Sequence, residues 1–338
     1  MAPLCLLYFV LVSTWLGAAG VLTERALPAA APRRWIWCVT ILGSIALPMA
    51  LSTSHSSHVI DLWGHELLRV PSAPAAGDAP ASSLRAWLDC GGSLGTVIRR
   101  VWFFAAAIAL VWGAASAWRL HRLVRSQRGP APGSSIVDGV QVTFTETLGP
   151  ATTGVWRPRV LVPRWVLALP AERRRYVVRH EEEHRRTRDA ALLTMAAVLV
   201  ALMPWNVPLW CHLRRLRLAV EMDCDRRVVA ALGDAVGYGE LLLDVAAAAS
   251  RAPRLQPALL GGSGMLERRL TALVAAGRRG VVNRFVAPVA ALALVAVVLS
   301  IPHPEMAREA PSPAGATDTG GSRTHAPTVA PRAHHRTP

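Results

Sequence analysis

Residues 170–189 read PAERRRYVVRHEEEHRRTRD and carry the pattern HExxH at residues 180–184. No glycine or second proline interrupts the stretch after Pro170, so it is predicted to form one helix that starts after that proline. His180 and His184 are four residues apart and share a helix face, so both imidazoles can bind one metal ion. Glu181 lies beside that face, where a carboxylate can take a proton from a metal-bound water. The stretch therefore predicts a helix that presents a catalytic zinc site.

An ordinary charged helix is the alternative to a metal site, because HExxH is short and occurs by chance. Arg179 and Glu183 have the i,i+4 spacing of an ion pair on a solvated helix face, and so have Glu182 and Arg186. We expect both pairs to form alongside the site.

A second acidic segment, EMDCD at residues 221–225, follows a break at 203–208 that contains two prolines. A helical hairpin would bring this segment back antiparallel to the HExxH helix, so that Glu221 supplies a third metal ligand. Asp225, one turn further on, would accept the second N–H of a ligand histidine and fix its tautomer. The outgoing arm is longer than the returning arm by roughly 10 Å of helix, so a bend near Asp189 is predicted.

Four uncharged runs approach or exceed the length of a membrane helix, which needs about 20 apolar residues; they are 2–22, 35–54, 101–118 and 285–302. A fifth run at 190–211 contains the proline break and must return Glu221 to the histidines, so we expect an embedded hairpin instead of a crossing. No basic residue precedes the apolar core of the first run, which favours an uncleaved span over a cleaved signal peptide.

The composition agrees with a membrane protein. All 37 basic residues are arginine, against 22 acidic residues, so the net charge is +15, and 52% of the residues are hydrophobic. Charged residues make up 17%, below the roughly 25% of soluble domains. An arginine surplus beside uncharged runs indicates membrane topology, and direct nucleic-acid binding is not expected. The five cysteines form no CxxC pair, which argues against a disulfide scaffold or a thiolate zinc site.

The arginines also predict an orientation. Residues 119–189 contain 14 arginines, whereas residues 54–100 contain four. Because arginine-rich loops stay in the cytoplasm, residues 119–284 are expected to be cytoplasmic. The N-terminus, the loop at 55–100 and the tail at 303–338 are then outside, in a multi-pass protein of the plasma membrane.

The expected fold is mainly α, with about four transmembrane helices and a small α+β catalytic domain between the third and last spans. The N-terminal region 1–118 holds three spans, and the domain at 119–284 contains the embedded hairpin. Residues 141–145 alternate as a strand does, and residues 160–162, flanked by prolines, are expected to form an edge strand that could pair with an extended substrate. The tail at 303–338 is rich in Ser, Thr, Pro and Ala and is predicted to be disordered.

Further motifs accompany the site in a fixed order: TGVWRPRVLVP at 153–163, PAE at 170–172, HExxH with Arg186 and Asp189, NxPLW at 206–210, ExxCD at 221–225, Tyr238 and LxRRL at 266–270. This series resembles the membrane-embedded gluzincins of the MecR/BlaR antirepressor type over roughly residues 1–302. The resemblance implies a zinc endopeptidase with His180, His184 and Glu221 as ligands and Glu181 as general base. Asp225 and Asp189 are expected to support the ligand histidines.

In these relatives the enzyme cleaves a DNA-bound repressor or triggers its loss, so the implied partner is a protein substrate such as a winged-helix repressor. Relatives with a sensor carry a penicillin-binding domain after the last span. The 338 residues contain no lysine, so β-lactam sensing by a Ser-x-x-Lys site within them is excluded. Glu182 and Glu183 replace the small or apolar residues usual between the histidines. A core-facing Glu182 would alter the packing, whereas a solvent-facing one is explained by its arginine pair.

Three other residues have two interpretations each. Tyr238 and His212 are candidates to donate a hydrogen bond to a reaction oxyanion, and the alternatives are a packed tyrosine and a surface histidine. Cys224 is expected to be a buried structural thiol instead of a redox centre. The leading function is a membrane zinc endopeptidase acting on a cytoplasmic or juxtamembrane protein. The alternatives are a housekeeping membrane protease and a signal transducer whose protease domain has lost activity.

Overall fold

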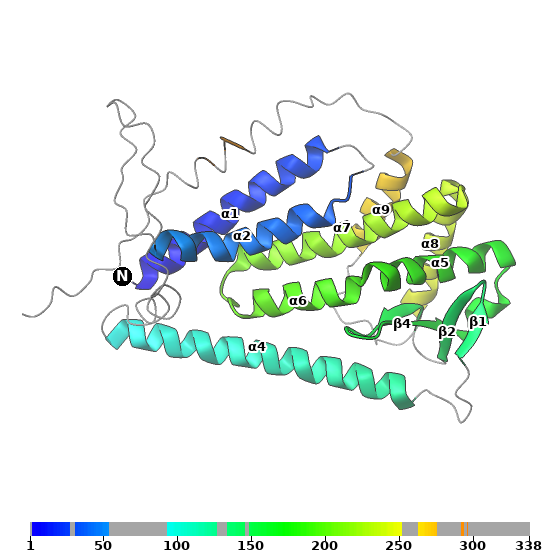
Figure 1. The fold of residues 1–338 in the computed structure, drawn as a ribbon, viewed down its shortest axis with the longest axis horizontal. Helices are drawn as coiled ribbons and strands as arrows, with labels where there is room; N and C mark the ends of the chain where they lie inside the picture. Colours follow the sequence, from blue (N-terminus) through cyan, green and yellow to red (C-terminus); the bar gives the residue numbers. More distant parts are fainter. Residues whose placement is uncertain are drawn as a thin grey trace, which may run out of the picture. The chain divides into compact units, whose positions relative to one another are not determined.

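The computed structural model describes residues 2–27, 31–53, 93–126, 134–145, 149–251 and 263–275, with 292, 293 and 296 besides. Figure 1 shows these parts as coloured ribbons. They are mostly helical with one small sheet, as the predicted fold class requires. The predicted loop at 55–100 lies outside the described residues up to residue 92, whereas residues 93–100 are helical and that part of the prediction is wrong. The predicted tail lies outside the described residues, and the last span lies almost entirely outside them.

Helices α1 (Ala2–Ala26), α2 (Arg34–Thr53) and α4 (Ser93–Ser126) cover the first three predicted spans. Within the described residues, two segments are long and apolar enough to cross a membrane, Cys5–Ala26 and Gly95–Ser126. The apolar part of α2 is shorter.

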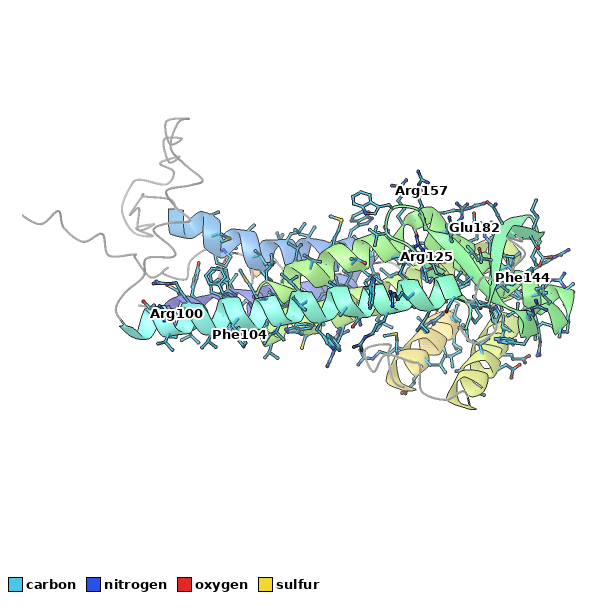
Figure 2. The ribbon with its side chains drawn as sticks, turned by 90° about the horizontal axis from the view of Figure 1, so that it is seen from below. Arg100, Phe104, Arg125, Phe144, Arg157 and Glu182 are labelled. Atoms are coloured by element: carbon cyan, nitrogen blue, oxygen red, sulfur yellow. The ribbon has the colours of Figure 1, made fainter. Side chains whose placement is uncertain are left out.

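Large apolar side chains project from α4. Phe104 is 70% exposed and stands on the helix between Arg100 and Arg125 (Figure 2). Val101, Phe103, Val111 and Trp112 are also exposed. A contiguous apolar surface of this kind is typical of a helix that contacts lipid or a partner.

Helices α1 and α2 pack against each other and against α7 (Val207–Leu232), as Figure 1 shows. Their shared core is apolar, and Phe9, Trp37 and Leu216 are almost fully buried in it. Asn206, just before α7, donates a hydrogen bond from Nδ2 to Ser13 Oγ at 2.9 Å, which fixes the start of α7 on α1.

The sheet has the strand order β1-β2-β4-β3; its strands are β1 (Ser134–Val137), β2 (Val140–Thr145), β3 (Ala151–Thr153) and β4 (Arg159–Pro163). β1 and β2 form an antiparallel hairpin through Asp138-Gly139, both with positive φ, the conformation that favours an Asp-Gly turn. β4 pairs parallel with β2 and antiparallel with β3. The prediction of an edge strand at residues 160–162 is therefore wrong. The flanking prolines mark the ends of β4, and β3 forms the edge instead.

Helix α5 (Ala171–Thr187) begins directly after Pro170, as predicted, and ends at Arg188. Arg188 has the left-handed conformation, with φ of 53°, and α6 (Asp189–Ala201) starts immediately after it. The break lies where the unequal arm lengths require a bend. α6 then turns into α7, and α7 packs against both α5 and α6.

Two further helices, α8 (Ala235–Arg251) and α9 (Ser263–Ala275), pack around α5 and α7. A second core unites the sheet with α5, α7 and α8, and Val162, Tyr176, Val228 and Tyr238 are buried in it. This core holds the HExxH helix between the sheet and α7.

Candidate metal centre

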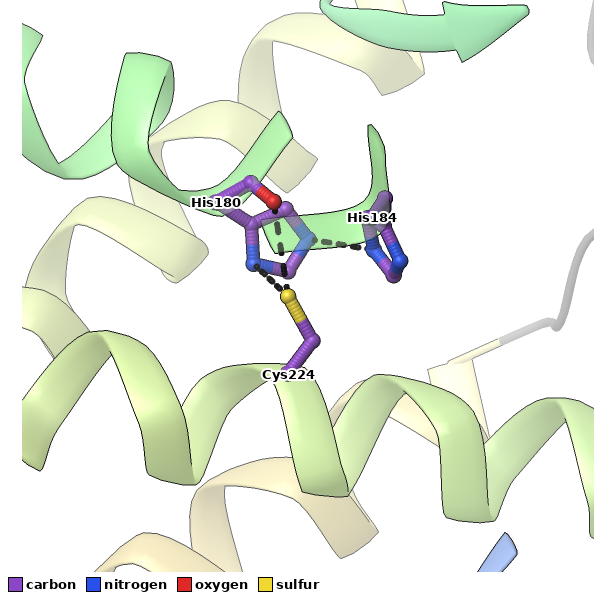
Figure 3. Close-up of side chains that lie close together, drawn as sticks. All are labelled: His180, His184 and Cys224. Atoms are coloured by element: carbon purple, nitrogen blue, oxygen red, sulfur yellow. Dashed lines mark hydrogen bonds between the residues drawn. The ribbon is translucent and has the colours of Figure 1, made fainter. Parts of the chain in front are cut away.

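Helix α5 brings the two histidines together, as their spacing predicts. The Nε2 atoms of His180 and His184 are 3.2 Å apart, and the two rings meet edge to face (Figure 3). The side chains are 14% and 12% exposed. Two ring nitrogens thus point at one place that is nearly shielded from solvent.

Glu221 of α7 carries its carboxylate to the same place. Its Oε2 lies 3.6 Å from His180 Nε2, and its Oε1 lies 3.7 Å from His184 Nε2. Ligand atoms of a tetrahedral zinc ion with bonds of about 2.0–2.1 Å are roughly 3.3–3.5 Å from one another. Two imidazoles and a carboxylate at these separations therefore fit zinc with little movement. That these three residues bind the metal stays a prediction.

The opposite nitrogens of both rings are engaged by hydrogen bonds. His184 Nδ1 lies 2.8 Å from Asp189 Oδ2, and His180 Nδ1 lies 2.9 Å from the Tyr238 hydroxyl. That hydroxyl donates to Asp225 Oδ1 at 2.7 Å, so it accepts from His180. With both Nδ1 atoms acting as donors, each Nε2 keeps a lone pair for a metal ion.

The structure revises the predicted roles of Asp225 and Tyr238. Asp225 Oδ1 is 3.6 Å from His180 Nδ1 and reaches it mainly through the tyrosine hydroxyl. Tyr238 is 1% exposed, and its only hydroxyl proton goes to Asp225. An oxyanion donor needs a free proton aimed at the reacting atom, so Tyr238 instead supports a ligand histidine. The register of α8 against α5, which decides this, is not visible in the sequence.

His212 is not brought to the site. It is buried on α7, nine residues before Glu221, which is about 13 Å along a helix. Its ring packs 5.8 Å from that of Trp37 and closely against Gly17 of α1. His212 therefore serves the packing of α7 on α1 and α2, and it is neither placed as an oxyanion donor nor exposed as a surface histidine, the two interpretations of the sequence.

Two arginines that the sequence did not single out complete the site. Arg269 of α9 lies 3.0 Å from Glu221 Oε2 and forms two hydrogen bonds to Asp225, at 2.7 and 2.8 Å. Arg34, at the start of α2, lies 2.6 Å from Asp189 Oδ1. Arg269 is part of the LxRRL motif at 266–270, which contributed to the family resemblance but to which the sequence assigned no function. Arg34 is the first residue of α2, and no role in the site was assigned to it from the sequence.

Cys224 is buried one turn after Glu221, and it lies with both histidines in a cluster whose ligand atoms are all within 4.8 Å of one another. Its Sγ lies 3.4 Å from both Nδ1 and the backbone carbonyl of His180, as the dashed lines in Figure 3 mark. That nitrogen is the one already bonded to Tyr238. The thiol is thus an alternative third ligand to Glu221, but it approaches the histidine from the side opposite to Nε2.

Glu181, the predicted general base, is 7% exposed and follows His180 on α5. Thr152 of β3 holds it: the Thr152 hydroxyl lies 2.7 Å from the Glu181 backbone carbonyl and 3.1 Å from its Oε2. Thr152 thereby links the edge strand β3 to Glu181. In the sequence Thr152 directly precedes the TGVWRP run at 153–158, and no role was assigned to it.

Both predicted ion pairs of the HExxH helix form: Arg179 contacts Glu183 at 2.7 Å and Arg186 contacts Glu182 at 2.8 Å. The two carboxylates are nevertheless buried, so this is no solvated face. Hydrogen bonds from Arg185, with smaller effects of Arg186, hold the pKa of Glu182 below its usual value although burial opposes this. Glu182 therefore remains charged beneath a cover of arginines.

The charges of the site shift the pKa values of its residues. Burial alone would lower the pKa of His180, but Cys224 and Glu221 raise it to about 10. For His184 burial also lowers the pKa, and the hydrogen bond to Asp189 with the charges of Cys224 and Glu221 raises it well above its ordinary value. Burial alone would raise the pKa of Glu221, but the hydrogen bond to His180 and the charge of Arg269 outweigh burial, so this pKa lies below its ordinary value. The acidic groups of the site thus favour the protonated form of both histidines.

A family model described as BlaR1 peptidase M56 matches residues 25–273. No curated protein and no solved structure gives a match. The matched region extends from the end of α1 into α9 and includes every site residue described above. Peptidases of this kind are typically metal-dependent, and the cluster on α5 and α7 is suited to a metal ion. A match over more than half of its length means that the chain belongs to the BlaR1 peptidase M56 family, a family of membrane-associated metallopeptidases.

Proposed function

We propose that the protein is a zinc-dependent integral-membrane endopeptidase that cleaves a cytoplasmic or juxtamembrane protein. The observation that carries this proposal is the pair of Nε2 atoms 3.2 Å apart, each with its Nδ1 engaged and both facing Glu221. On an ordinary charged helix, nothing requires that both histidines be hydrogen-bonded through Nδ1 while both Nε2 atoms face the same point.

A zinc ion bound there would polarise a water molecule and lower its pKa toward 7. The protein's own contribution is to hold the ligands and to accept the water proton. His180 and His184 are oriented by Tyr238 and Asp189, and Glu221 is held by Arg269. Glu181 is not one of the proposed metal ligands. It takes the proton from the water and passes it to the leaving amine.

The proposed substrate is an extended polypeptide segment that adds to β3. This strand ends the described sheet, and its Thr152 contacts the base Glu181. An added strand would present its backbone next to the HExxH helix, with main-chain hydrogen bonds that require no particular sequence. A DNA-binding repressor is the substrate class that the family resemblance favours. The ordered site favours hydrolysis over a catalytically silent transducer.

The test compares membrane and cytoplasmic proteomes of cells that express the wild type or Glu181→Gln. The substitution keeps the size of the side chain and removes the base, so zinc and fold should be retained while cleavage falls by roughly 10²- to 10⁴-fold. Glu172→Gln, at the start of the same helix, is the matched control and should process substrates as the wild type does. Wild-type processing by Glu181→Gln would reject the hydrolytic function and favour the transducer.

A further inference from the structure

The buried cluster around Arg34 connects α2 to the metal centre. The Arg34 guanidinium lies 2.6 Å from Asp189 Oδ1 and 3.2 Å from Asp223 Oδ2. All three side chains are nearly inaccessible, at 6%, 3% and 1% exposure. They come from the first turn of α2, the first turn of α6 and the middle of α7. One buried cation thus holds two carboxylates from separate helices.

Asp189 uses its two oxygens for different partners. Oδ1 accepts from Arg34, while Oδ2 lies 2.8 Å from His184 Nδ1. A planar carboxylate that is held at one oxygen cannot rotate freely at the other, so Arg34 sets the direction of the bond to the histidine. The other arginine near Asp189 is Arg227, whose Nη2 is 3.9 Å away and which pairs at 2.9 Å with Glu183 instead.

Asp223 fixes the start of α2 from the other side. The backbone N–H groups of Arg33 and Arg34 both donate to its carboxylate, at 3.2 Å each. These groups lie at the N-terminus of α2, where backbone donors lack partners within the helix. The first turn of α2 is therefore attached by backbone and side chain to α7, which carries Glu221, and by a side chain to α6, whose first residue Asp189 contacts His184.

We propose that Arg34 is a positioning residue of the metal centre, which holds Asp189 so that Asp189 holds His184, and that it couples the first turn of α2 to metal binding. The role of His184 as a ligand is taken from the proposed function. Because α2 is one of the apolar helices of the membrane region, a displacement of its first turn would reach a metal ligand through two side-chain contacts.

The first experiment measures zinc affinity of the purified full-length chain by competition with a chelator, and the visible spectrum of its cobalt(II) form. Arg34→Gln should lower zinc affinity by roughly 10- to 100-fold, as loss of support for a ligand histidine typically does, and should alter the cobalt spectrum. Arg34→Lys keeps the buried charge and should restore part of the affinity. Arg33→Gln is the matched control, because the Arg33 Nε has no hydrogen-bond partner among the described residues, and it should bind as the wild type does.

Removing Arg34 leaves Asp189 and Asp223 with more distant cations only, Arg227 at 3.9 Å and Arg226 at 3.5 Å, and this loss of a buried charge could prevent folding. The double variant Arg34→Gln/Asp223→Asn removes one buried charge of each sign and still leaves Asp189 without its guanidinium. Thermal unfolding and size-exclusion chromatography should show that this double variant is folded. It should nevertheless bind zinc as weakly as Arg34→Gln. Wild-type affinity and cobalt spectrum in either folded variant would overturn the positioning role. Failure of the wild type itself to bind zinc would instead reject the metal site of the proposed function.

Hydrogen exchange tests the coupling separately. Zinc should increase the protection of the amides of residues 33–37 in the wild type, because coupling between two sites acts in both directions. The increase should vanish in Arg34→Gln/Asp223→Asn and persist in Arg33→Gln. Equal protection of the wild type with and without zinc would mean that α2 is not coupled to the site.

Discussion

At the scale of single residues, the choice of third ligand separates two kinds of metal site. Glu221 and Cys224 are one helical turn apart on α7, and both lie near the histidines. Glu221 faces the two Nε2 atoms, whereas the thiol lies against a nitrogen that is already hydrogen-bonded. Three protein ligands leave the fourth position of a zinc ion open whichever residue is the third, so the geometry alone makes Glu221 the predicted ligand.

The corresponding prediction compares Glu221→Ala with Cys224→Ala. Glu221→Ala removes one of three proposed protein ligands and should abolish tight zinc binding, while Cys224→Ala removes a packing contact and should retain it. Metal analysis after dialysis, with unfolding temperature as the control for folding, distinguishes the two. Loss of zinc from Cys224→Ala with retention in Glu221→Ala would exchange the two assignments.

The pKa values predict how zinc affinity depends on pH. The pKa of His180 rises to about 10 and that of His184 rises well above its ordinary value, so both rings carry an extra proton at neutral pH before metal binds. Zinc must displace those protons, and its affinity should therefore increase as pH rises from 6 to 8. Calorimetry in buffers of different ionisation enthalpy should record release of about one proton or more per ion. A pH-independent affinity without proton release would contradict the shifted values.

At the scale of elements, the contact of α1 with α7 depends on one glycine. A Cβ on Gly17 would collide with the His212 ring, which is confined between α1 and Trp37. Gly17→Ala should lower the free energy of unfolding by about 1–3 kcal/mol, the usual cost of overpacking. Gly113→Ala in α4 is the control, because a Cβ there meets no atom within 4 Å. Chemical denaturation in detergent measures both, and equal stabilities would disprove the close contact.

The elements show what the sequence could and could not predict. The start of α5, its bend near Asp189, β2 and the meeting of His180, His184 and Glu221 followed from local spacing. The position of β4 inside the sheet did not, because β3 is only three residues long and so short a strand gives little periodicity to reveal its pairing with β4.

The same limit applies to the residues that support the site. Arg34, Thr152 and Arg269 act from α2, β3 and α9 on residues of α6, α5 and α7 respectively, and no periodicity in the sequence relates these elements. Their side chains could be assigned only after the helices were placed. Glu182 shows the converse, since its pair with Arg186 was predicted from spacing, whereas the spacing left open whether Glu182 is buried.

At the scale of the whole molecule, α7 joins the membrane helices to the catalytic residues. Its first half packs on α1 and α2 through Leu209, Leu213 and Leu216, and its second half carries Glu221 and Asp225. A single helix of 26 residues thus belongs to both regions. Under the proposed function, the site on α5 and α7 would then lie close to the membrane surface, which favours cytoplasmic or juxtamembrane proteins as substrates.

The orientation in the membrane decides which compartment supplies the substrate. The segment 119–189 contains 14 arginines against four at 54–100, and moving arginine-rich loops across the membrane is disfavoured. A reporter fused after Arg128 should therefore behave as cytoplasmic, and one fused near Ala81 should behave as external. Replacing Arg119, Arg122, Arg125 and Arg128 together by Gln should weaken this preference, whereas the same number of changes beyond residue 303 should not. The opposite pattern in the unchanged protein would place β3 and the metal centre outside the cell, and a cytoplasmic repressor could then not be the substrate.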